Sequence, residues 1–182
     1  MEKKYLQKVP AYTRILNMLQ DRLRHELVAL GLHPAFRSRV KSFESYYDKI
    51  LNLLAKNKSR HEACLIYDVM GLRIVCPFLD DLNVVEEHIA RSYEVFEIEH
   101  KGSEQNFWEF GYKSIHFLIK VPPEILSQCC CEGLGLCEIQ LRTILQDAWS
   151  EVEHELIYKS DSGPLDEPMK RKLAALNANL TL

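Results

Sequence analysis

One short stretch of the chain, Cys137–Thr143, alternates strictly between apolar and polar side chains. Successive side chains of a β-strand point to opposite faces of the sheet. One face would therefore be apolar, and the other would present an acid, an amide and a guanidinium from Glu138, Gln140 and Arg142. A strand half-exposed to water shows the same alternation, so a chemical role for this face depends on what other segments bring to it.

Basic and hydroxyl side chains gather in a second place, at the predicted start of a helix. The segment Arg39–Ser42 is followed by Ser45 and Lys49, and Ser42, Ser45 and Lys49 recur at helical steps. Free N–H groups at a helix N-terminus, with hydroxyls and flanking cations, suit the binding of phosphate. The alternative is a solvated basic loop capped by a serine.

An acidic residue precedes an apolar strand that itself carries an arginine. Asp68 leads through Gly71 into this strand, and Arg73 lies near its start. A charged group inside an apolar run must be paired or must bind something charged. Asp68 is a candidate Mg²⁺ ligand, because Mg²⁺ prefers carboxylate oxygens and keeps waters and substrate phosphates. A structural Asp68–Arg73 ion pair is the alternative.

A third candidate cluster lies where a polar, aromatic loop enters a strand, in the segment Gly111–His116. Tyr112 follows a glycine and could present its ring as a stacking platform for a base. His116 shares a predicted strand face with Ser114, away from the apolar side chains. The alternative for His116 is a purely structural role.

The elements that position these clusters follow from hydrophobic periodicity. Branched and apolar segments predict strands at 72–78, 93–99, 114–121 and 137–143. Helical stripes predict helices at 12–32, from Ser42 onward, at 81–92 and at 144–158. Strands alternating with helices indicate an α/β fold, a mixed sheet of about five strands flanked by helices.

The composition excludes several classes of protein. The chain has 182 residues and a net charge of −3, so its surface as a whole does not attract nucleic acid. No apolar run approaches the roughly 20 residues that span a bilayer, and the N-terminus has no signal core, which predicts a cytoplasmic protein without membrane contact. The six cysteines form no C-x-x-C pair, and we expect no zinc site.

Taken in order, these motifs resemble one family. Arg-x-Lys-Ser, Asp-x-x-Gly-x-Arg, Gly-Tyr-x-Ser-x-His and Glu-x-Gln-x-Arg-Thr are followed by Trp149–His154 and Tyr158-Lys159. Their order and spacing are similar to those of the RelA/SpoT synthetase domain, over about Arg37–Lys159. The resemblance implies a nucleotidyltransferase-like synthetase fold for residues 37–160, with helical extensions at 1–36 and 161–182. The chain contains no His-Asp pair, so we expect no hydrolase domain of the kind found in long members.

The resemblance also implies an activity and a set of site residues. Members of the family transfer the β,γ-pyrophosphate of ATP to the 3′-hydroxyl of GDP or GTP, which makes the alarmone (p)ppGpp and AMP. Asp68 and Glu138 would then be catalytic and would hold Mg²⁺, with Glu138 also accepting the hydroxyl proton. ATP would be bound by Arg39, Lys41, Ser45, Lys49 and Arg73, and the acceptor by Lys101, Tyr112, His116, Gln140 and Arg142.

The loop before Tyr112 departs from the family pattern. Lys101 is in place, but Gly102 and Ser103 replace a usual Asp-Tyr pair, and Phe110 stands where asparagine is usual. The identity of the acceptor therefore stays open, and the 3′ end of tRNA or an adenine nucleotide is an alternative to GDP or GTP. A second alternative is a domain that binds nucleotide as a sensor without catalysis. The leucine stripe at 16–30 could support a homo-oligomer or pack on its own domain.

Overall fold

The computed structural model describes residues 1–56, 66–101, 114–129 and 135–153, together with residues 168 and 172. Within these ranges the helices are α1 (Glu2–Leu6), α2 (Val9–Ala29), α3 (Phe43–Lys56), α4 (Leu79–Ser92), α5 (Pro123–Cys129) and α6 (Ile144–Glu153). The strands are β1 (Ala35–Val40), β2 (Met70–Cys76), β3 (Val95–Lys101), β4 (Ser114–Lys120) and β5 (Leu136–Thr143). The predicted mixed α/β architecture is confirmed.

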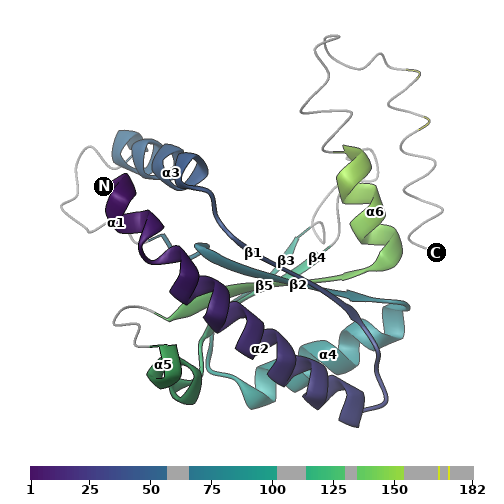
Figure 1. Cartoon of the computed structure of the whole chain (residues 1–182). Helices are drawn as coiled ribbons and strands as arrows, with labels where there is room; N and C mark the ends of the chain where they lie inside the picture. Colours follow the sequence, from purple (N-terminus) through teal and green to yellow (C-terminus); the bar gives the residue numbers. More distant parts are fainter. Residues whose placement is uncertain (57–65, 102–113, 130–134, 154–167, 169–171, 173–182) are drawn as a thin grey trace.

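The described strands form one sheet in the order β1-β2-β5-β4-β3. Only the central β2–β5 pair is parallel, and the β1–β2, β5–β4 and β4–β3 pairs are antiparallel. Figure 1 shows α2, α4 and α5 on one side of this sheet, with α3 and α6 on the other side near opposite ends.

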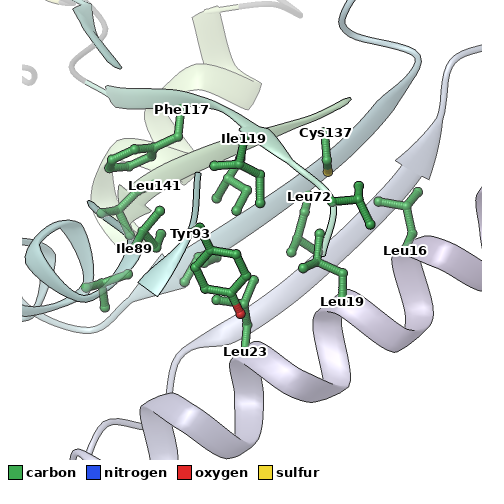
Figure 2. Close-up of a cluster of buried hydrophobic side chains, with 14 of the residues drawn as sticks. Leu16, Leu19, Leu23, Leu72, Ile89, Tyr93, Phe117, Ile119, Cys137 and Leu141 are labelled. Carbon is green, nitrogen blue, oxygen red and sulfur yellow. The ribbon is translucent and has the colours of Figure 1, made fainter. Parts of the chain in front are cut away.

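The hydrophobic core lies between the sheet and α2, α4 and α5. Cys137, Ile139 and Leu141 of β5 are fully buried, as the alternation of that strand predicts. Figure 2 shows leucines of α2 facing the side chains of the sheet, among them Leu72. Because the strand period is two, burying this face turns Glu138, Gln140 and Arg142 to the opposite face.

The leucine stripe of α2 packs within this core. Leu16, Leu19, Leu23 and Leu27 are each at most 1% exposed, whereas Leu30, which follows the helix, is half-exposed. Packing on its own domain therefore accounts for the stripe. Among the described helices, none is long and apolar enough to cross a membrane.

Three described elements are missing from the sequence-based prediction. β1 is an edge strand with the sequence Ala-Phe-Arg-Ser-Arg-Val, and its exposed polar residues resemble a basic loop. Backbone pairing with β2, rather than a hydrophobic pattern, makes it a strand. The short helices α1 and α5 also escape prediction, because five and seven residues are too few to show helical periodicity.

Candidate active site

The polar face of the sheet is assembled by strand register. Arg73 lies opposite Gln140 in the β2–β5 pair, and Gln140 lies opposite His116 in the β5–β4 pair. Residues opposite one another across a sheet project to the same face. This face therefore combines predicted site residues from neighbouring strands, and its ends are bordered by α3 and α6.

Asp68 lies just before β2 and is held by two lysines. The Nζ atoms of Lys41 and Lys49 each lie 2.7 Å from its Oδ2 atom. Lys41 follows β1 directly, and Lys49 is on the second turn of α3. The ion pair proposed as an alternative, Asp68 with Arg73, is not formed, because Arg73 is paired instead with Asp147 and Glu151 of α6.

The start of α3 is fixed by a serine cap. The Ser45 N–H donates to the Ser42 Oγ atom at 3.3 Å, and the Ser42 hydroxyl donates to the Ser45 Oγ atom at 3.1 Å. Such a cap satisfies one of the free N–H groups of the first helical turn. It places Ser45, which is exposed, and Lys49 on one side of the helix, as their spacing predicts.

The electrostatic environment keeps Asp68 ionised. Burial acts to raise the pKa of Asp68, but the hydrogen bonds from Lys41 and Lys49 outweigh it and bring the pKa below its ordinary value. The second carboxylate oxygen, Oδ1, is buried and has no hydrogen-bond partner among the described residues. A buried, unpaired carboxylate oxygen is costly unless it binds a ligand.

Each carboxylate oxygen of Glu138, on the polar face of the sheet, has one side-chain partner. The Nδ1 atom of His116 lies 3.0 Å from Glu138 Oε1, and Gln140 Nε2 donates to Glu138 Oε2 at 2.9 Å. Burial acts to raise the pKa of Glu138, and the contact with His116 chiefly offsets it, so the pKa lies below its ordinary value. The charge of Asp68 acts in the opposite direction and raises the pKa of Glu138.

These two carboxylates fit a Mg²⁺ ion. Mg²⁺ is typically bound through one or two carboxylates, with waters and substrate phosphates as the other ligands. The unpaired Oδ1 atom of Asp68 is available as such a ligand, and the charge of Asp68 acts on the pKa of Glu138. No cluster of three or more acidic, histidine or cysteine side chains that could hold a metal occurs among the described residues.

A buried aspartate of α6 joins the arginines at the other end of the polar face. Asp147 Oδ1 accepts from Arg73 Nη1 at 2.8 Å and from Arg142 Nη1 at 3.3 Å, and its Oδ2 atom lies 3.2 Å from Arg37 Nη1. Arg142 also donates to Ser150 Oγ at 2.7 Å. Asp147 is therefore the shared anionic partner of three arginines from three strands.

Asp147 is absent from the sequence-based list of site residues. The sequence offered one signal, an aspartate among the apolar residues of an amphipathic helix. Its three partners lie in β1, β2 and β5, so only the fold identifies what this aspartate neutralises. Burial, then the charge of Arg73, lower the pKa of Arg142 to about 10, although Asp147 acts to raise it.

Two further predicted residues, Arg39 and Lys101, lie at the edges of the sheet. Arg39 is exposed on β1 opposite Gly71, where a side chain at position 71 would meet the Arg39 Cγ atom at 3.7 Å. Lys101 ends the edge strand β3, with its Nζ atom 3.6 Å from Glu99 Oε2. Tyr112 and the altered acceptor loop lie outside the described residues, as do the motif residues from His154 to Lys159.

Residues 38–163 match the family described as "Region found in RelA / SpoT proteins". The chain belongs to the RelA/SpoT family. Two Bacillus subtilis relatives are similar to it: GTP pyrophosphokinase YjbM is 34% identical over 74% of this chain, and GTP pyrophosphokinase YwaC is 31% identical over 68% of it. The matches span 61% and 57% of those two relatives, respectively.

Solved structures share the fold of this RelA/SpoT member. The crystal structure of the small alarmone synthetase 1 from Bacillus subtilis has a TM-score of 0.74 at 28% identity, and covers 98% of this chain and 91% of that one. A structure of the same synthetase bound to its product pppGpp has a TM-score of 0.71 at 26% identity, with 98% and 92% covered. The expected synthetase fold is thereby confirmed.

Proposed function

We propose that this protein is a Mg²⁺-dependent pyrophosphokinase of the cytoplasm, which transfers the β,γ-pyrophosphate of ATP to the 3′-hydroxyl of GDP or GTP. Family membership and the names of the two B. subtilis relatives support the reaction class. The product-bound structural neighbour supports a guanine nucleotide as acceptor. The products would be (p)ppGpp and AMP.

One observation carries this proposal: the two predicted metal-binding carboxylates, Asp68 and Glu138, have different partners. Asp68 faces the two lysines, whereas Glu138 faces His116 and Gln140. Group transfer between two nucleotides requires a cationic site for the donor phosphates and a separate group that accepts the hydroxyl proton. Asp68, with its two lysines, would belong to the donor phosphate site, and Glu138 would be the group that accepts the hydroxyl proton.

The donor side would bind ATP through two lysines that already lie together, both in contact with Asp68. Lys41 and Lys49 would exchange part of their contact with Asp68 for contacts with the triphosphate, and Ser45 would add a hydroxyl. Arg39 and Arg73 would stack on the adenine, because planar guanidinium groups pack well against aromatic rings. Asp147 holds the Arg73 guanidinium at a defined place before ATP arrives.

The acceptor side would be organised around Glu138. His116 and Gln140 orient its carboxylate and keep it ionised, which suits a group that takes the proton from the 3′-hydroxyl. Gln140 is itself held by Arg142, whose Nη2 atom donates to Gln140 Oε1 at 3.1 Å. Tyr112 and Lys101 would complete the acceptor site. A bound Mg²⁺ ion would neutralise charge on the transferred pyrophosphate.

Label transfer from γ-³²P-ATP with Mg²⁺ tests the proposal. Parallel reactions contain GDP, GTP, no added acceptor or deacylated tRNA, and the Glu138→Gln protein is the control. We expect label on GDP or GTP that is lost in the variant. Label on tRNA or on an adenine nucleotide would replace the proposed acceptor, and ATP binding without transfer to any acceptor would identify a sensor domain.

A further inference from the structure

The short N-terminal helix α1 contributes a buried tyrosine to the donor side of the site. Tyr5 is 7% exposed, and its ring centroid lies 4.6 Å from that of Tyr46 and 5.8 Å from that of Phe43, both on α3. Its hydroxyl donates to the main-chain carbonyl of Lys41 at 2.5 Å. A residue near the N-terminus is thereby joined to the segment that leads into α3.

The main chain of Lys41 is held from two directions. Its N–H donates to the carbonyl of Val69 at 2.9 Å, which joins it to the segment between Asp68 and β2. Its carbonyl accepts from Tyr5, and its side chain reaches Asp68. The position of the Lys41 ammonium relative to Asp68 therefore depends on two main-chain hydrogen bonds, and one of them comes from α1.

The hydroxyl of Tyr5 is suited to this task. Burial raises the pKa of Tyr5 to about 12, so the hydroxyl remains a donor at neutral pH. The aromatic contacts fix the ring against α3, which leaves the hydroxyl little freedom to seek another partner. A donor that is itself held in place restricts the position of its acceptor more than a mobile donor does.

We propose that Tyr5 is a positioning residue of the donor site, which holds the Lys41 main chain so that the Lys41 ammonium meets the phosphates of ATP. The inference rests on the proposed function, because it assumes that Lys41 binds ATP. The Tyr5 hydroxyl is bonded to Lys41 on the donor side, whereas the bonded partners of Glu138 are His116 and Gln140. The effect of Tyr5 should therefore fall on ATP and leave the acceptor unaffected.

Tyr93 provides a matched control. It is also 7% exposed, and its hydroxyl donates to Glu26 Oε2 at 2.8 Å. It belongs to the core cluster on the other side of the sheet. Tyr5→Phe and Tyr93→Phe each remove one hydroxyl from a buried ring, so any effect of general destabilisation should appear in both variants.

The test measures binding of a non-hydrolysable ATP analogue by calorimetry, the KM values for ATP and acceptor, and amide hydrogen exchange in residues 42–46. We expect Tyr5→Phe to weaken analogue binding and raise KM for ATP by about three- to tenfold, as loss of one hydrogen bond implies. The KM for the acceptor stays unchanged, exchange in 42–46 becomes faster, and Tyr93→Phe changes none of these.

Two results would overturn the inference, and they differ from failure of the proposed function. Unchanged analogue binding in Tyr5→Phe, with an active wild-type protein, would show that the hydroxyl does not position Lys41. Equal losses in Tyr5→Phe and Tyr93→Phe would show a general structural role. A wild-type protein that neither binds the analogue nor transfers pyrophosphate would overturn the proposed function itself, and this inference with it.

Discussion

Replacing Asp147 with alanine should destabilise the folded protein strongly. The Asp147 side chain is 6% exposed and is the shared partner of Arg37, Arg73 and Arg142. Arg142 is as buried as Asp147, so its charge would be left without this compensation inside the protein. Removing one partner of a buried ion pair typically costs about 3–5 kcal/mol, mostly from the uncompensated charge that remains.

The contributions of the three arginines are unequal. Arg37 is largely exposed, and its contact with Asp147 adds little because water screens it. Arg142, and in part Arg73, are shielded from solvent and account for most of the cost. For a protein of this size about 1 kcal/mol corresponds to roughly 2–4 °C, so the melting temperature should fall by about 6–20 °C.

Glu151→Ala is the matched control. Glu151 Oε1 lies 3.1 Å from Arg73 Nη1, the same atom that contacts Asp147, but the Glu151 side chain is 59% exposed. An exposed pair of this kind contributes about 0–1 kcal/mol. The free energies of unfolding of both variants are measured by thermal and urea unfolding. Equal losses of stability in the two variants, or a loss below about 1 kcal/mol for Asp147→Ala, would refute the role assigned to burial.

Three further perturbations follow from the same contacts. Ser42→Ala removes the cap of α3 and should cost about 1 kcal/mol in urea unfolding; no loss would show that the cap is not formed in solution. Lys49→Met removes one of the two cations on Asp68 and should raise the KM for ATP without changing the KM for the acceptor; equal changes in both would contradict a donor-side role. Burial acts to raise the pKa of Glu26, but its contacts with His88 and other neighbours hold the pKa below its ordinary value of 4.5. Its contribution to stability is therefore present above that value and is lost as the pH falls through the lowered folded pKa. The melting temperatures of wild type and Glu26→Gln should therefore differ at pH 7 and converge once the pH is below the lowered pKa; a constant difference would refute this.

Local patterns predicted the part of the site that depends on local geometry. The strict alternation of β5 was sufficient to place Glu138 and Gln140 on one face, because strand period and burial of one face determine orientation together. The helical spacing of Ser45 and Lys49 likewise predicted their place on α3. In both cases the relevant side chains lie within one element.

Features that depend on contacts distant in sequence could not be predicted. Asp147 was missed, because its arginine partners come from three strands that only the folded sheet brings together. The lysine partners of Asp68 were not predicted either, because Lys41 and Lys49 lie far from Asp68 in the sequence and only the fold brings them to it. β1 was missed because an edge strand with exposed polar residues is defined by its pairing rather than by its composition.

The site residues themselves remain predictions until they are tested by substitution. The geometry adds specific expectations to the family resemblance: Asp68 belongs with the donor lysines, and Glu138 belongs with His116 and Gln140. A substitution at Asp68 should therefore impair ATP binding as well as turnover. A substitution at Glu138 should impair turnover with ATP binding largely retained.

The most direct test of the central claim is the stoichiometry of the products. Unlabelled ATP and GDP are incubated with the protein and Mg²⁺, and the nucleotides are separated by anion-exchange chromatography. The account predicts AMP and a guanine nucleotide carrying two additional phosphates in equal amounts, with neither formed by Glu138→Gln. Formation of ADP in place of AMP, or of AMP without a pyrophosphorylated guanine nucleotide, would contradict it.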